Sequence, residues 1–236
     1  MDAASPAADG SNGSPTARSL EHVKLHRRRF PLDGQLFTLF CVRPTEPERF
    51  QVTRSAGSAS ASTFDIVASA GGNRLLGVLC WAMAFQTHEP AVVVIGDPLV
   101  LAGADGSPGA PIVVVNAALA TPGVAGFEEL RVALASEIES QGTVKLSTRG
   151  LARALHDPPA FDAAQAEAGV KPGSHRTRRW VDLIGGVVVL AAPPGVLRSI
   201  AVDRASAPSV SESFPVVSRH QTSPERRVPT DEASPL

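Results

Sequence analysis

Histidines are the first residues to consider for metal or acid–base chemistry, because the chain of 236 residues has six of them and only two cysteines, Cys41 and Cys80. Two cysteines cannot build a disulfide framework or a cysteine-based zinc knuckle. The histidines stand at positions 22, 26, 88, 156, 175 and 220. Among them, only His22 and His26 have a spacing that would place two imidazoles on one face of a helix, where they could bind a metal. Three arginines follow the pair directly, which favours a solvated basic segment over a metal site.

A second candidate for chemistry lies between Ile112 and Ser140. This window begins with the β-branched run IVVV, continues through a turn of small residues and ends in an amphipathic segment. From Pro122 to Gln141 the apolar residues recur at three- and four-residue steps, which predicts a helix with one buried face. The helix carries Glu-Glu-Leu at 128–130 and Leu-Ala-Ser-Glu-Ile-Glu-Ser at 134–140.

This window resembles the active-site region of the HtpX-like and CAAX-prenyl-protease group of zinc metallopeptidases. In that group a strand, a short turn and an E-E-L helix lead into an H-E-x-x-H motif, whose histidines bind Zn²⁺ and whose Glu deprotonates the metal-bound water. The resemblance places Ser136, Glu137 and Ser140 at the His, Glu and His positions. The third ligand of the group is a Glu on a later helix, and the segment that fits it here has Ser199 at the ligand position and Asp203 at the group's following Asp.

The three serines change what the resemblance implies. A serine hydroxyl is neutral near pH 7 and does not supply the imidazole, thiolate or carboxylate that Zn²⁺ selects. Glu137 would keep the general-base position without a metal-acidified water to act on. The resemblance therefore implies a zincin-like domain that has lost its zinc and holds no cofactor. Its expected role is non-catalytic binding or regulation of a protein or peptide, in the old cleft between a strand edge at 112–115 and the helix that carries Glu137.

Three alternatives stay open from the residues alone. The first is an unrelated structural or interaction protein that has no cleft. The second is an active zinc-dependent, membrane-associated peptidase, and the third is a hydrolase with an unrecognised site. No nucleotide-binding glycine loop and no nucleophile-elbow motif supports another catalytic class.

The order of the predicted elements indicates an α+β fold, with a small antiparallel or mixed sheet packed against the helix at 122–141. Strands are expected at Gln35–Val42, Ala91–Ile95 and Ile112–Val115, with a further short one at 99–101. A helix is expected over 72–86 with Asn73 as its N-cap, and shorter helices over 147–156 and 161–168. Small and polar residues dominate 1–18 and 206–236, so we expect disordered tails around one domain at 19–205.

One further segment predicts either a membrane contact or a buried helix. Arg176, Arg178, Arg179 and Trp180 precede an uncharged apolar run from Leu183 to Leu197. Arginines and a tryptophan beside such a run are typical of an interfacial anchor, so 180–198 could touch a membrane or an anion. The run is too short to span a bilayer and contains Pro193-Pro194, which also fits a buried core helix.

The charge balance and the N-terminal segment set expectations for partners and location. A net charge of −1 gives no specific nucleic-acid signal. The first residues lack the apolar region of a signal peptide, so we expect a cytoplasmic protein or one at the cytoplasmic face of a membrane.

Overall fold

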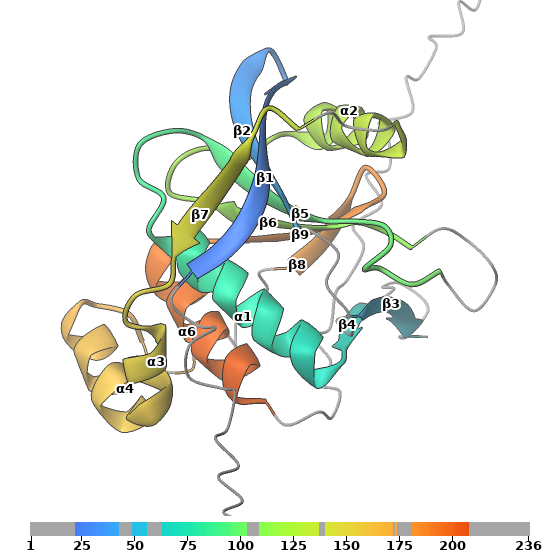
Figure 1. The fold of residues 1–236 in the computed structure, drawn as a ribbon. Coiled ribbons are helices and arrows are strands. Elements are labelled where there is room, and N and C mark those ends of the chain that lie inside the picture. The colour runs from blue at the N-terminus through green and yellow to red at the C-terminus, as the bar shows by residue number, and fades with distance from the viewer. Residues whose placement is uncertain are drawn as a thin grey trace, which may run out of the picture.

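The computed structural model describes residues 22–42, 49–55, 63–102, 109–136, 140–171, 173 and 181–207. Within these ranges the fold is α+β, as predicted, with a seven-stranded mixed sheet between two layers of helices (Figure 1). The predicted N-terminal tail at 1–18 and the predicted C-terminal tail beyond residue 207 lie outside the described residues.

The described elements alternate irregularly between strands and helices along the chain. The strands are β1 (His22–Leu32), β2 (Gln35–Val42), β3 (Phe50–Ser55), β4 (Thr63–Ala68), β5 (Ala91–Ile95), β6 (Ile112–Asn116), β7 (Thr143–Ser147), β8 (Val181–Ile184) and β9 (Val187–Ala192). The helices are α1 (Ala70–Ala84), α2 (Val124–Ala135), α3 (Leu151–His156), α4 (Pro158–Glu167) and α6 (Pro194–Ser206).

The main sheet has the strand order β7-β1-β2-β5-β6-β9-β8, and β3 pairs with β4 in a separate ribbon. The pairs β2–β5 and β6–β9 are parallel, and the other neighbours are antiparallel. The central strands β5, β6 and β9 are nearly continuous apolar runs because helices cover both of their faces. The sheet is mixed but larger than the small sheet that was expected.

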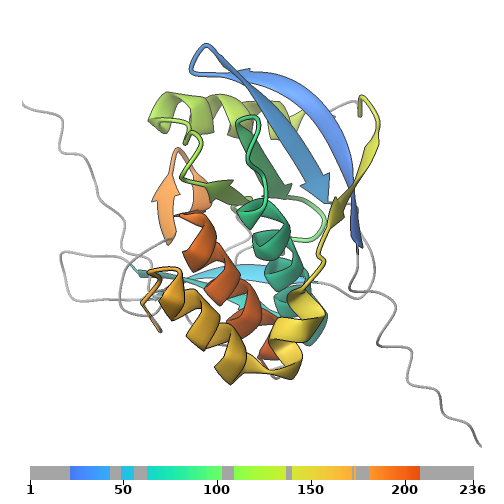
Figure 2. The ribbon, with the colours of Figure 1, turned by 90° about the vertical axis from the view of Figure 1, so that its left-hand side faces the viewer.

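The two faces of the sheet carry different helices. On one face α1 and α6 lie side by side, as Figure 2 shows, and bury Phe40, Val93 and Val114. On the other face α2 inserts Phe127 and Leu130 over a second apolar layer. Because strand side chains alternate between the faces, each buried residue belongs to one layer or the other.

The N-terminal strand β1 replaces the solvated basic segment expected around His22–Arg29. It pairs with β2 through a tight hairpin, whose turn residues Asp33 and Gly34 have φ angles of 51° and 74°. Positive φ at both central residues is the requirement of the hairpin turn that Asp-Gly favours. Its other edge pairs with β7. The basic residues therefore stand on a strand inside the sheet, and not at a disordered margin.

The helix expected to run from Pro122 to Gln141 is shorter. It ends at Ala135, and Ser136 is its C-cap with an extended backbone (φ −96°, ψ 148°). Residues 140–142 lie beside β1, where the Gln141 N–H donates to the Arg27 carbonyl. Ser136 and Ser140 are thus not on one helix. The arrangement of an H-E-x-x-H motif, in which two residues four apart lie on the same helix face, does not apply to them.

Most of the apolar run at 183–197 does not form the buried helix that was one of its two predicted outcomes. Residues 181–192 fold as the hairpin of β8 and β9, and Val187–Leu190 are at most 1% exposed. No helix in the described ranges is long and apolar enough to cross a membrane.

Other local predictions have mixed outcomes. The strands at 35–42, 91–95 and 112–115 are confirmed. Helix α1 is confirmed, but its N-cap is Ser69, whose hydroxyl accepts the Gly72 N–H, and not Asn73. Residues 99–101 form no strand beyond one bridge between Val100 and Phe50, and Ser147 ends β7 before α3 begins.

Candidate functional site

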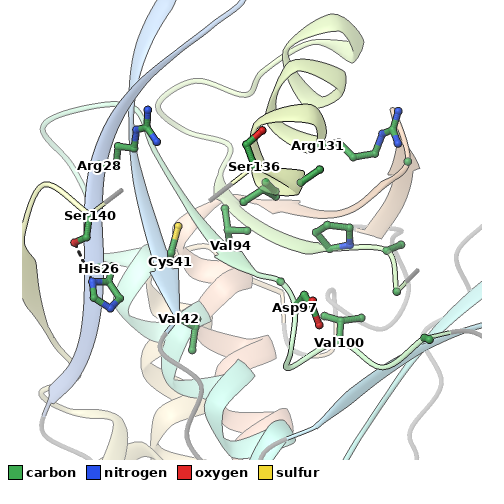
Figure 3. A pocket seen from close by; sticks show the side chains of 18 of the residues that line it. His26, Arg28, Cys41, Val42, Val94, Asp97, Val100, Arg131, Ser136 and Ser140 are labelled. Atoms are coloured by element: carbon green, nitrogen blue, oxygen red, sulfur yellow. Dashed lines mark hydrogen bonds between the residues drawn. The ribbon is translucent and has the colours of Figure 1, made fainter. Parts of the chain in front are cut away.

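A cavity of about 890 Å³ opens on the α2 side of the sheet. It lies beyond the C-terminal end of α2, above the strands β1, β2 and β5 (Figure 3). Since α2 is only 12 residues long, it leaves this part of the sheet face uncovered. The loops that follow β5 and precede β6 close the opposite side, at 96–102 and 109–111. The size is in the range of pockets that hold small ligands or short peptide segments.

The floor of the cavity is apolar. Val94 of β5 and the Cys41 side chain of β2 point into it from the sheet, and Leu134 of α2 covers them from above. Val100 and Pro111 continue the apolar surface toward the loops. An apolar body of a ligand would therefore lose its contact with water on this floor.

Basic side chains of β1 form one wall. His26 and Arg28 stand directly opposite Cys41 and Leu39 in the β1–β2 register, so all four side chains lie on the α2 side of the sheet. The Arg28 guanidinium carbon lies 5.7 Å from the centre of the Phe30 ring, a cation–π contact that holds the half-buried arginine against the wall. At the far end, Arg131 of α2 lies against the β8–β9 turn at Gly186. The cavity thus carries fixed positive charge at two separated places.

Two features of the described lining are negative, one a carboxylate and the other a helix end. Asp97 is the one carboxylate in the lining that the structure describes, against the arginines 27, 28 and 131. The C-terminal end of α2 at Ser136 also faces the cavity and carries the partial negative charge of a helix end. The described lining thus has basic groups at β1 and at Arg131, and one carboxylate at Asp97.

Ser140 and His26 form a polar contact at the β1 wall of the site. The Ser140 Oγ lies 2.9 Å from the His26 Nδ1. The same Oγ donates to the Gly142 carbonyl at 2.7 Å and accepts the Gly142 N–H at 3.2 Å. Since a hydroxyl has a single proton, its donation to Gly142 leaves His26 Nδ1 as the donor in the other bond. This arrangement braces the turn at 140–142 against β1.

The Cys41 thiol faces the cavity from the floor. Burial raises its pKa above the ordinary value, and the positive charge of Arg28 opposes that shift without cancelling it. Because the thiolate is the nucleophilic form, Cys41 stays a neutral and weakly reactive thiol at pH 7. Its side chain adds to the surface of the cavity floor.

The residues singled out by the metallopeptidase resemblance do not come together. Ser136 and Ser140 line the cavity. Ser199 lies on α6, on the opposite face of the sheet, where it is 9% exposed and donates to the Gly195 carbonyl. Asp203 lies one turn further along α6. Ser199 therefore does not line the cavity that Ser136 and Ser140 line, because the sheet lies between α2 and α6.

The donor set does not fit a zinc ion either. Two neutral hydroxyls at the cavity offer none of the ligands that Zn²⁺ selects. Within the described residues, no group of three His, Cys, Asp or Glu side chains is placed to hold a metal. Glu137 lies outside the described residues, as do Arg176, Arg178, Arg179 and Trp180.

The predicted cleft also differs from the observed one. The strand at 112–115 is β6, which pairs with β5 on one side and β9 on the other, so it offers no free edge to a substrate. The cavity lies over β1, β2 and β5 instead. Its basic wall was missed because the segment around His22–Arg29 was not expected to form a strand, although Asp33-Gly34 directly before the apolar run at 35–42 was a hairpin signal.

The chain matches no family model, no curated protein and no solved structure. Its function therefore has to be inferred from the geometry and charge of the cavity.

Proposed function

We propose that this domain is a non-catalytic binding module that holds an anion with an apolar body in the cavity beside α2. The observation that carries the proposal is the pairing of an apolar floor with the basic wall of β1. Arginine binds carboxylate, sulfonate and phosphate groups through its planar guanidinium, and Arg28 is already oriented by the ring of Phe30.

The electrostatics define an orientation for the ligand. The anionic group belongs at His26 and Arg28, which project from the same face of β1, because Asp97 would repel it beside the loop that follows β5. The apolar body then lies on Val94 under Leu134. A ligand that carries a hydrogen-bond donor at its far end would gain from the carbonyls at the end of α2.

A fluorescent probe tests this proposal without knowledge of the natural ligand. 1-Anilinonaphthalene-8-sulfonate has an aromatic body and one sulfonate, and N-phenyl-1-naphthylamine is its uncharged counterpart. We expect the sulfonate probe to bind more tightly than the neutral one. Arg28→Gln should weaken the sulfonate probe about tenfold, since a charge-assisted hydrogen bond contributes about 1.5–3 kcal/mol and a half-buried site realises part of it.

Two comparisons make the test specific. Arg153→Gln removes an exposed arginine of α3 outside the cavity lining and should leave both affinities unchanged. Arg28→Gln should also leave the neutral probe unaffected. Equal binding of the two probes, or equal effects of the two substitutions, would contradict the proposal.

The metallopeptidase resemblance stays a prediction and does not support this function. Its zincin-like site requires the positions of Ser136 and Ser199 to meet, whereas these residues lie on opposite faces of the sheet. A binding role for a peptidase-like domain was the expectation from the sequence. The binding role proposed here rests on different residues, mainly those of β1.

A hydrolase is the second candidate, favoured by the 2.9 Å distance between Ser140 Oγ and His26 Nδ1. In that case Ser140 would attack a carbonyl carbon and pass its proton to His26. The donation of the hydroxyl to Gly142 argues against it. Labelling of Ser140 by a fluorophosphonate, lost in His26→Ala, would favour the hydrolase over the binding module.

A further inference from the structure

The strand β7 (Thr143–Ser147) forms one edge of the main sheet (Figure 1). Among the described residues β1 is its only strand partner. The Arg27 N–H donates to the Gly142 carbonyl just before β7 begins. Since hydrogen-bonded and non-hydrogen-bonded pairs alternate in an antiparallel ladder, the pairs of Val144 and Leu146 face β1. The backbone groups of Thr143, Lys145 and Ser147 consequently point to the free edge.

Two lysines stand directly opposite each other on this edge. Lys24 of β1 is the register partner of Lys145 of β7, in a non-hydrogen-bonded pair whose side chains lie closest together. Both side chains are exposed, and neither ammonium has a hydrogen bond or ion pair with any residue that the structure describes. Like charges directly opposite destabilise a sheet, so the pair has a cost for the fold.

The lysine pair continues the basic wall of the cavity. Lys24, His26 and Arg28 alternate along β1 and therefore project from the same face, with Lys145 beside them. Ser140 lines the cavity and leads through Gly142 into β7. The basic face thus runs unbroken from the free edge of β7 to the cavity.

We propose that β7 docks an acidic peptide in extended conformation, which adds a strand to the sheet and directs its end into the cavity. The backbone groups of Thr143, Lys145 and Ser147 would pair with the peptide backbone. Carboxylates at every second peptide residue would lie over Lys145 and Lys24 and compensate their charge. Only the last step, the passage into the cavity, rests on the proposed function.

Other occupants fit this edge less well. A second copy that paired through β7 would bring the lysines of two chains together, which repels. A single-stranded nucleic acid binds through aromatic side chains that stack on bases, and the basic face described here offers only Phe30, which Arg28 already covers. An acidic peptide uses both features of the edge, namely its backbone groups and its charge.

The test uses a short fluorescein-labelled peptide of alternating Glu and Thr, with a Gln-Thr peptide of the same length as control, and reads fluorescence anisotropy with the full chain. We expect the Glu-Thr peptide to bind and the Gln-Thr peptide to bind at least tenfold more weakly. Lys145→Gln should weaken binding about threefold, as the loss of one exposed charge does. The matched control Lys171→Gln, which removes an exposed lysine after α4, should have no effect.

A proline separates strand addition from plain charge attraction. Lys145→Pro removes the same charge as Lys145→Gln and also the edge-facing N–H, while β1 loses no bond. Strand addition predicts that Lys145→Pro weakens the peptide about fivefold more than Lys145→Gln does. Equal effects of Pro and Gln would overturn it, as would tighter binding of an oligothymidylate than of the Glu-Thr peptide.

The two proposals fail separately. If the Glu-Thr peptide does not bind while the sulfonate probe still depends on Arg28, the peptide edge is wrong and the cavity function stands. If the peptide binds through β7 while the sulfonate probe ignores Arg28, the cavity function is wrong and the edge stands.

Discussion

Gly77 of α1 provides a test of the packing that fixes the helical layer under the sheet. A Cβ added at Gly77 would lie 2.6 Å from the Ala201 carbonyl oxygen and 2.9 Å from both the backbone nitrogen and the Cβ of Ala205. Two of these atoms belong to the α6 backbone, so the helices have to separate to admit a methyl group. Overpacking of this kind costs about 1–3 kcal/mol, and rigid backbone neighbours favour the upper part of that range.

The substitution Gly77→Ala also has a favourable component that must be subtracted. Alanine exceeds glycine in helix propensity by about 1 kcal/mol in a helix interior. We therefore expect a net loss of about 1–2 kcal/mol in the free energy of unfolding. For a domain of this size the melting temperature then falls by about 5 °C.

Circular dichroism during thermal and urea unfolding measures this loss, with Gly96→Ala as the matched control. A Cβ at Gly96 meets nothing within 4 Å, so this variant should differ from the wild type by less than about 0.5 kcal/mol. If Gly77→Ala instead raises the melting temperature, the gain in helix propensity exceeds the packing cost. The close approach of α1 to α6 described here would then be contradicted.

Two further predictions concern the thiols and the β1–β2 hairpin. Iodoacetamide should alkylate Cys41 slowly in the folded protein and Cys80 not at all, because Cys80 is fully buried and its pKa is raised to about 12. The rate of Cys41 alkylation should still rise as the pH passes 9.0, because burial raises the pKa of this thiol. A saturating concentration of the sulfonate probe should protect Cys41 from alkylation. Modification of Cys80 before unfolding, detected by peptide mass mapping, would contradict its burial. Asp33→Ala removes the carboxylate that accepts the Gly123 N–H before α2 and forces alanine into a positive φ. It should lower the free energy of unfolding, measured in urea, by about 2 kcal/mol. Asp33→Asn should lower it by less than about 1 kcal/mol. Equal losses in the two variants would show that neither the acceptor oxygen nor the backbone angle decides the cost.

The interior of the sheet could be predicted from local sequence. The runs AVVV at 91–94 and IVVV at 112–115 are apolar and almost wholly β-branched, and every residue of β5 and β6 is buried. The composition of such runs therefore predicts that they are buried. The first helix is likewise visible as a long apolar segment with few breaks.

The ends of helices and the hairpins at the edges of the sheet depend on contacts between distant segments, which local sequence patterns do not show. The segment at 136–141 has no Gly or Pro that would stop a helix, yet α2 ends at Ala135 and Gln141 pairs with Arg27 of β1. The apolar run at 183–197 fits a buried strand and a buried helix equally well, since its hydrophobic pattern has no distinctive period. Gly185 and Gly186, with φ angles of 58° and 78°, were the available signal for the β8–β9 hairpin.

The candidate site was hidden from the sequence for a related reason. A strand whose two faces are covered shows an apolar pattern, whereas His26 and Arg28 stand on the part of the sheet that α2 leaves open. Because these residues are polar, the sequence predicted a solvated segment here and no strand. The same residues become a basic wall only when α2, β2 and the loop at 96–102 surround them.

The location of the bound anion is the most direct test of the account. Amide chemical shifts of ¹⁵N-labelled protein, followed during titration with 1-anilinonaphthalene-8-sulfonate, report which residues the probe touches. We predict saturable shifts at Arg28, Cys41, Val94, Leu134 and Ser136, which line the cavity. Shifts confined to α1 and α6 on the opposite face, with none at those five residues, would contradict it.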